Sequence, residues 1–125
     1  MFKIRLGIPE IDALWSDLNA RNLGDGLNGD DARLFKKWGK AMALLSDNPR
    51  HPGLNSHEID PLSRRYGLKV FQSYLENQTP GAGRMYWVYG PGKAEITVIG
   101  LEPHPEDKKK AGYAKVRLSD MGKEI

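Results

Sequence analysis

The fold of this chain is decided by residues 84–101, which read RMYWVYGPGKAEITVIGL. Two runs in this stretch, 84–89 and 94–101, are rich in the β-branched and aromatic residues that favour strands. The sequence GPGK between them is typical of a turn, so we expect an antiparallel hairpin. Apolar residues in both runs do not alternate cleanly with polar ones, which predicts that both faces of the sheet are largely covered.

The sequence before the hairpin predicts one strand and two helices. FKIRLGI at 2–8 alternates apolar and basic residues with the period of a strand. Pro9 suits the first turn of the helix that follows, and a Gly- and Asn-rich loop ends that helix. Asp30 or Asp31 is expected to cap the second helix, which stops before Pro49. The helices bury apolar residues at helical spacing: Ile11, Leu14, Trp15 and Leu18 in the first, and Phe35, Trp38, Met42 and Leu45 in the second.

The remaining elements complete an α+β domain. LKVFQSYL at 68–75 is strand-like, and YAKVRLS at 113–119 is a candidate for a last strand. The expected order is strand, helix, helix, then three or four strands. This order predicts a single domain over residues 1–125, with the two N-terminal helices packed on one face of a small antiparallel sheet.

Composition excludes several classes of site. The 125-residue chain contains no cysteine, which removes thiol catalysis, thiolate metal sites and disulfides. No secretory signal is visible, and no run approaches the roughly 18 apolar residues that cross a membrane. We therefore expect a soluble, cytoplasmic protein without membrane contact.

Charge is unevenly divided along the chain. Residues 1–48 hold 7 basic and 7 acidic side chains, whereas residues 49–125 hold 12 and 9, which supplies the whole net charge of +3. A polyanionic partner is therefore expected at the second half. The alternative is a solvated surface with a slight excess of lysine.

Two segments resemble the RelE/ParE family of toxins: NPRHPGLNSHEID at 48–60 and GAGRMYWVYGPGKAEITVIGLEPHP at 81–105. The resemblance implies the toxin of a toxin–antitoxin pair, with a cognate antitoxin protein as partner. Many members cut mRNA in the ribosome without a metal, so it implies an endoribonuclease that needs no cofactor. Other members act on DNA gyrase. Two alternatives to the nuclease are therefore a protein-binding module on the same fold and a divergent member without toxicity.

Metal-free RNA cleavage requires a base for the 2′-hydroxyl, an acid for the departing 5′-oxygen and cations for the phosphorane. His104 is the first candidate for a proton-transfer role, because histidine as a residue type ionises near neutral pH and Pro103 and Pro105 restrict the backbone here. The alternative is an ordinary loop histidine. Arg84 opens a strand, as an arginine does in the family, and suits phosphate binding. It could equally cover apolar surface with its stem.

The resemblance also implies roles for further residues. Glu58 would be the general base, and Tyr113 would stack on a base or assist proton transfer. The alternatives are a surface carboxylate and a core tyrosine. Phosphate-backbone contacts are expected from Lys108, Lys109 and Lys110, and from Arg64 and Arg65. A solvated turn would explain the lysines equally well. The three histidines match no zinc spacing, so no metal is expected.

Overall fold

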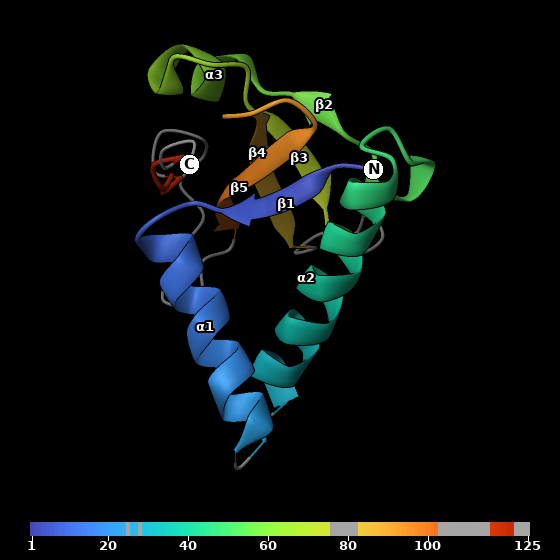
Figure 1. Cartoon of the computed structure of the whole chain (residues 1–125), viewed down its shortest axis with the longest axis vertical. Helices are drawn as coiled ribbons and strands as arrows, with labels where there is room; N and C mark the ends of the chain where they lie inside the picture. Colours follow the sequence, from blue (N-terminus) through green and yellow to red (C-terminus); the bar gives the residue numbers. More distant parts are fainter. Residues whose placement is uncertain (25, 28, 76–82, 103–115, 122–125) are drawn as a thin grey trace.

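A computed structural model describes residues 1–24, 26–27, 29–75, 83–102 and 116–121. Its helices are α1 (Glu10–Leu23), α2 (Gly29–Asp47), the 3-10 turn Pro52–Leu54 and α3 (Asp60–Tyr66). Its strands are β1 (Lys3–Leu6), β2 (His57–Glu58), β3 (Phe71–Tyr74), β4 (Arg84–Tyr89) and β5 (Glu95–Glu102). The predicted α+β class, with two helices preceding most of the sheet, is confirmed (Figure 1).

The sheet has the order β1-β5-β4-β3-β2 and is mixed. β1 runs parallel to β5, and the other three pairs are antiparallel. The expectation of a wholly antiparallel sheet is therefore wrong at β1. β1 and β5 are far apart in the sequence, so no local pattern specifies the direction in which they pair. The helical hairpin brings the chain back to the beginning of β1, where Ser46 in the last turn of α2 makes two hydrogen bonds with the backbone of Phe2.

The predicted β4–β5 hairpin is confirmed. The amide of Gly90 donates to the carbonyl of Glu95 over 2.8 Å, and the hydroxyl of Thr97 donates to the carbonyl of Gly90 over 2.8 Å. Gly90 has φ +105°, a backbone conformation open mainly to glycine. The pairing register shifts at Tyr86 and Trp87, where β5 carries one extra residue.

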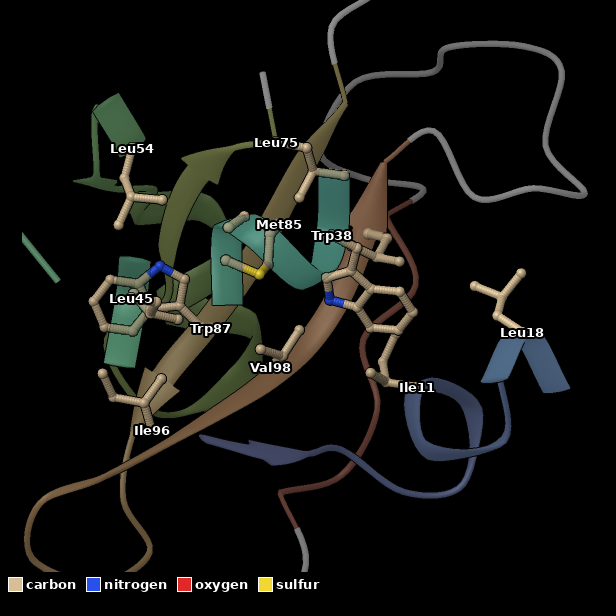
Figure 2. Close-up of a cluster of buried hydrophobic side chains, with 12 residues drawn as sticks. Ile11, Leu18, Trp38, Leu45, Leu54, Leu75, Met85, Trp87, Ile96 and Val98 are labelled. Atoms are coloured by element: carbon tan, nitrogen blue, oxygen red, sulfur yellow. The ribbon is translucent and has the colours of Figure 1, made fainter. Parts of the chain in front are cut away.

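One face of the sheet packs against α1 and α2. Figure 1 shows these two helices diverging from their connecting loop toward the sheet. Figure 2 shows the cluster of buried side chains that the helices and the sheet contribute to this core. Trp38 and Leu45 of α2 and Trp87 of β4 are almost completely buried there. Trp15 is half-buried and stacks on Phe35, with ring centroids 4.8 Å apart. The predicted burial of Trp38 is confirmed, whereas Trp15 is only partly buried.

A second apolar cluster covers the opposite face. Its buried members are Ile59, Leu62, Val70, Tyr86, Val88, Ile99 and Val116. They come from β4, β5, the α3 region and the segment 116–121, so both faces of the sheet are covered, as expected. A helix on this face was not predicted from the sequence. Pro61 in the first turn and Gly67 with φ +91° just after the last residue are standard signals for a helix such as α3.

Two boundaries differ from expectation. α2 begins at Gly29, so Asp30 and Asp31 lie inside its first turn instead of capping it. There they complement the positive end of the helix dipole. In the expected last strand, residues 113–115 lie outside the described residues. Residues 116–121 form only an isolated bridge between Asp120 and Ile8.

Candidate functional site

Four of the expected site residues are described by the structure. Arg84 is the first residue of β4, Glu58 is the last residue of β2, and Arg64 and Arg65 lie in α3. The other candidates lie outside the described residues: His104, Lys108, Lys109, Lys110 and Tyr113.

Glu58 and Arg84 are not brought together. Glu58 pairs with Phe71 at one end of β3, whereas Arg84 pairs with Tyr74 at the other end. Phe71 and Tyr74 are three residues apart and so project from opposite faces of the sheet. At about 3.4 Å per residue and 4.8 Å per strand, the Cα atoms of Glu58 and Arg84 are about 14 Å apart. A small group held by Arg84 is therefore not within direct reach of Glu58.

Arg84 instead lies in a row with one residue from each neighbouring strand. It is directly opposite Tyr74 of β3 and directly opposite Glu102 of β5. Its Nη1 donates to the Glu102 Oε1 over 2.7 Å, and the two side chains are 27% and 17% exposed. Within this row, Tyr74–Arg84–Glu102, the hydrogen bond between Arg84 and Glu102 is charge-assisted, and solvent reaches the two side chains only in part.

The guanidinium of Arg84 is charged and has more N–H donors than its hydrogen bond to Glu102 uses. Burial lowers its pKa, but the Tyr86 phenol and the Glu102 carboxylate raise it by more, so its pKa lies above the ordinary value and the charge is permanent. Its Nε is buried and has no hydrogen-bond partner among the described residues. An arginine has five N–H donors. Because this Nε is shielded from solvent, an anion can reach Arg84 only through the Nη atoms of a side chain that is 27% exposed.

The chain that leaves the sheet after Glu102 returns over the same face. The amide of Ser119 donates to the carbonyl of Ile99 over 2.7 Å. Gly100 makes this crossing possible, because a Cβ there would lie 2.8 Å from the carbonyl oxygen of Arg117. The described residues on either side of 103–115 are both held in place, Glu102 by its pairing in β5 and Val116 by the second apolar cluster.

Arg65 belongs to the returning segment more than to an open basic surface. Its Nη2 donates to the carbonyl of Val116 over 2.5 Å, which ties α3 to the C-terminal segment. Arg64 is exposed. Arg65 is exposed as well, so a contact to phosphate is sterically open to both, but one nitrogen of Arg65 is already used in the bond to Val116.

A groove of about 580 Å³ runs between α3 and the returning segment. Its lining is partly apolar, with one basic and one acidic residue: Arg65, Tyr66, Leu68, Val116, Leu118, Asp120 and Met121. The Tyr66 hydroxyl donates to the carbonyl of Ser119 over 2.9 Å. Burial, followed by the nearby Asp120 carboxylate, raises the pKa of Tyr66, so the phenol stays protonated and serves as a structural donor.

The described residues contain no group of three or more histidine, aspartate or glutamate side chains that could hold a metal ion. His51 instead accepts a hydrogen bond from the amide of Gly53 through Nδ1, at 2.9 Å. The candidate chemistry in the described part of the chain is therefore that of Arg84 and its neighbours.

Tyr74 and Glu102 were missed as candidates from the sequence. Each is the last residue of its strand, a position at which polar side chains are common. They are candidates because they lie opposite Arg84 on the two neighbouring strands. That placement depends on the strand register, which the sequence does not show.

None of the helices in the described ranges is long and apolar enough to cross a membrane. No protein-family model matches the chain. Searches of curated proteins and of solved structures likewise give no match.

Proposed function

We propose that the chain is the toxin of a RelE/ParE-type toxin–antitoxin pair and cleaves mRNA on the ribosome, in the cytoplasm, without a metal. The proposal is supported by the resemblance of 48–60 and 81–105 to that family. It is also supported by the order of elements, a strand and two helices followed by an antiparallel hairpin, which is the order that the resemblance implies.

The observation that carries the proposal is the pairing of Arg84 with Glu102. His104 follows Glu102 by only two residues, and two residues span at most about 7 Å of chain. Directly opposed residues on antiparallel strands have Cα atoms about 5 Å apart. The expected phosphate-binding group and the expected proton donor are thereby tied to the same end of one hairpin.

The reaction follows from these roles. A base takes the proton of the 2′-hydroxyl, and the 2′-oxygen forms a bond to the adjacent phosphorus. The bond from phosphorus to the 5′-oxygen breaks, and His104 gives that oxygen its proton. The products are a 2′,3′-cyclic phosphate and a 5′-hydroxyl. Arg84 offsets the charge that develops on the phosphorane.

The base in this proposal is a carboxylate. The resemblance implies Glu58, which lies about 14 Å from Arg84 by strand geometry. Glu102 lies 2.7 Å from Arg84 and is therefore better placed to reach a 2′-hydroxyl beside a phosphate bound there. Lys108, Lys109, Lys110 and Arg64 would contact the RNA backbone, and Tyr113 would stack on a base.

Induced expression with primer extension on cellular mRNA tests the proposal. The wild-type protein should arrest growth and produce new transcript ends, whereas Arg84→Ala should produce neither at equal protein level. Co-expression with the product of an adjacent short gene should give a stable complex and restore growth. Arrest without new transcript ends would reject the nuclease.

The second candidate function is a non-enzymatic protein-binding module, such as a gyrase-targeting toxin. The observation that favours it is the same ion pair, because an arginine already neutralised by Glu102 attracts phosphate less strongly. In that case Arg84→Ala would leave growth arrest unchanged, and supercoiling by purified gyrase would be inhibited.

A further inference from the structure

The middle of α2 carries four cations at neighbouring positions. Arg33, Lys36, Lys37 and Lys40 lie within eight residues. Each has two of the others at the three- or four-residue spacing that brings side chains together on a helix. Asp30, three residues before Arg33, is the one carboxylate at such a spacing from any of them.

These cations face away from the core. Arg33, Lys36 and Lys40 are exposed and Lys37 is half-buried, whereas the apolar residues of α2 face the sheet. Arg33 and Lys37 interact with other groups as well. Lys36 and Lys40 make no hydrogen bond or ion pair with the described residues, so their charges are fully available to a partner.

The arrangement opposes helix stability and favours an anion. Like charges at three- and four-residue spacing repel and weaken a helix. An anion that lies along this face reduces the repulsion between the cations. Anion binding should therefore stabilise α2 as well as form new contacts.

The geometry favours a phosphate backbone over an acidic protein. Arg33 and Lys40 are about 10.5 Å apart along the helix axis, a length over which one strand of a duplex carries about three phosphates. Protein interfaces have apolar or aromatic centres and few lysines, and the exposed positions between Arg33 and Lys40 include no large apolar side chain.

We propose that the α2 cation face, formed by Arg33, Lys36, Lys37 and Lys40, binds the phosphate backbone of double-helical nucleic acid without reading its sequence. α2 covers one face of the sheet and Arg84 lies on the other. The sheet therefore separates this surface from the proposed cleavage site, and the two can be occupied together. Binding here does not require that the protein cleave RNA.

The test uses the purified full chain and fluorescence anisotropy with two 20-base-pair duplexes, one RNA and one DNA. The DNA arm has no 2′-hydroxyl and so excludes any effect of cleavage. With about three phosphate contacts, affinity should fall about 40-fold between 50 and 200 mM KCl. The double variant Lys36→Gln/Lys40→Gln keeps two cations, so it should lose at most about 12-fold over the same range and bind more weakly at 50 mM.

Two matched variants make the test specific. Lys69→Gln/Lys93→Gln removes the same charge from exposed positions outside α2 and should keep the wild-type salt dependence. Lys36→Arg/Lys40→Arg keeps the charge and should bind as the wild type does. The midpoint of thermal unfolding of Lys36→Gln/Lys40→Gln should match or exceed that of the wild type, because a repulsion has been removed.

Three results would overturn the proposal. The first is no duplex binding at 50 mM KCl. The second is an equal salt dependence for the wild type and Lys36→Gln/Lys40→Gln. The third is a polyglutamate peptide that competes as well as either duplex at equal charge, which would assign the α2 cation face to an acidic protein.

Discussion

The guanidinium of Arg84 and the carboxylate of Glu102 lie 2.7 Å apart on directly opposed residues of β4 and β5. Both side chains are mostly shielded from solvent. The pair closes the end of the hairpin at the point where the chain leaves the sheet toward His104, and Tyr74 flanks it on the other side. The proposed phosphate-binding group, Arg84, is thus held by Glu102, the proposed base. Mutation of one residue at a time can therefore separate phosphate binding from proton transfer.

Glu102→Gln should separate binding from chemistry. The amide keeps the size of the side chain but removes the counter-charge of Arg84. Unfolding free energy should fall by about 1 kcal/mol, the upper end for a partly exposed ion pair. As the proposed base, Glu102 should contribute at least about 100-fold to single-turnover cleavage of mRNA on programmed ribosomes. RNA affinity should hold or rise. Glu58→Gln is the control, and an equal loss in both variants would argue against Glu102.

His104→Ala should slow the chemical step. Removal of a general acid costs about 10²–10⁴-fold, and the RNA affinity should be retained because Arg84 and the lysines still bind phosphate. The measurement is single-turnover cleavage with binding followed in parallel. His57→Ala, at an exposed position on β2, is the matched control and should cleave normally. Wild-type rates for a folded His104→Ala protein would remove the proposed acid.

Ser73→Ala should destabilise the core. The Trp87 indole N–H donates to the Ser73 hydroxyl over 2.8 Å, and both residues are buried. The variant leaves this donor without its partner, which costs about 1–3 kcal/mol. Urea unfolding followed by tryptophan fluorescence measures the loss. Ser16→Ala on the exposed face of α1 should be neutral or slightly stabilising, so comparable losses in the two variants would contradict this account.

Tyr66 should add an alkaline limit to stability. Burial, with a contribution from Asp120, raises its folded-state pKa above the unfolded value of about 10. The folded protein therefore holds this proton more tightly, and the stabilisation is complete below pH 10 and is lost as the pH rises through the folded pKa. Tyr66→Phe should cost about 1 kcal/mol at pH 8, where its hydrogen bond to Ser119 is missing.

At higher pH the gap between the wild type and Tyr66→Phe should shrink, because an ionised Tyr66 cannot donate to the Ser119 carbonyl. The comparison of the two proteins cancels the titration of lysines and of the other tyrosines. A gap that stays constant from pH 8 to pH 11.5 would show that the ionisation of Tyr66 is not linked to folding.

The parts of the fold that were predictable depend on local sequence. The β4–β5 hairpin and both long helices follow from residue type and periodicity within short windows. β1 next to β5 is a pairing between distant segments, and no local pattern specifies its direction. α3 had usable signals in Pro61 and Gly67, but seven residues are too few to show helical periodicity.

The site was less predictable because register decides it. Tyr89 pairs with Ile96 near the turn, and a regular hairpin would then place Leu101 opposite Arg84. The extra residue in β5 shifts the partner to Glu102. The charge distribution in the first half of the chain was likewise not predicted from the counts alone. They balance in number, but helical spacing gathers the cations of α2 on one face.

The parallel edge strand also has a consequence during protein synthesis. β1 leaves the ribosome long before its partner β5, since Lys3 lies opposite Glu95. The whole stretch from β1 to β5 must be translated before β1 can pair, which gives the sheet a high contact order. A nascent chain that stops before β5 also lacks Ile96 and Val98 of the core. The tertiary structure, and any activity that depends on it, should therefore appear only after β5 has been translated and has left the ribosome.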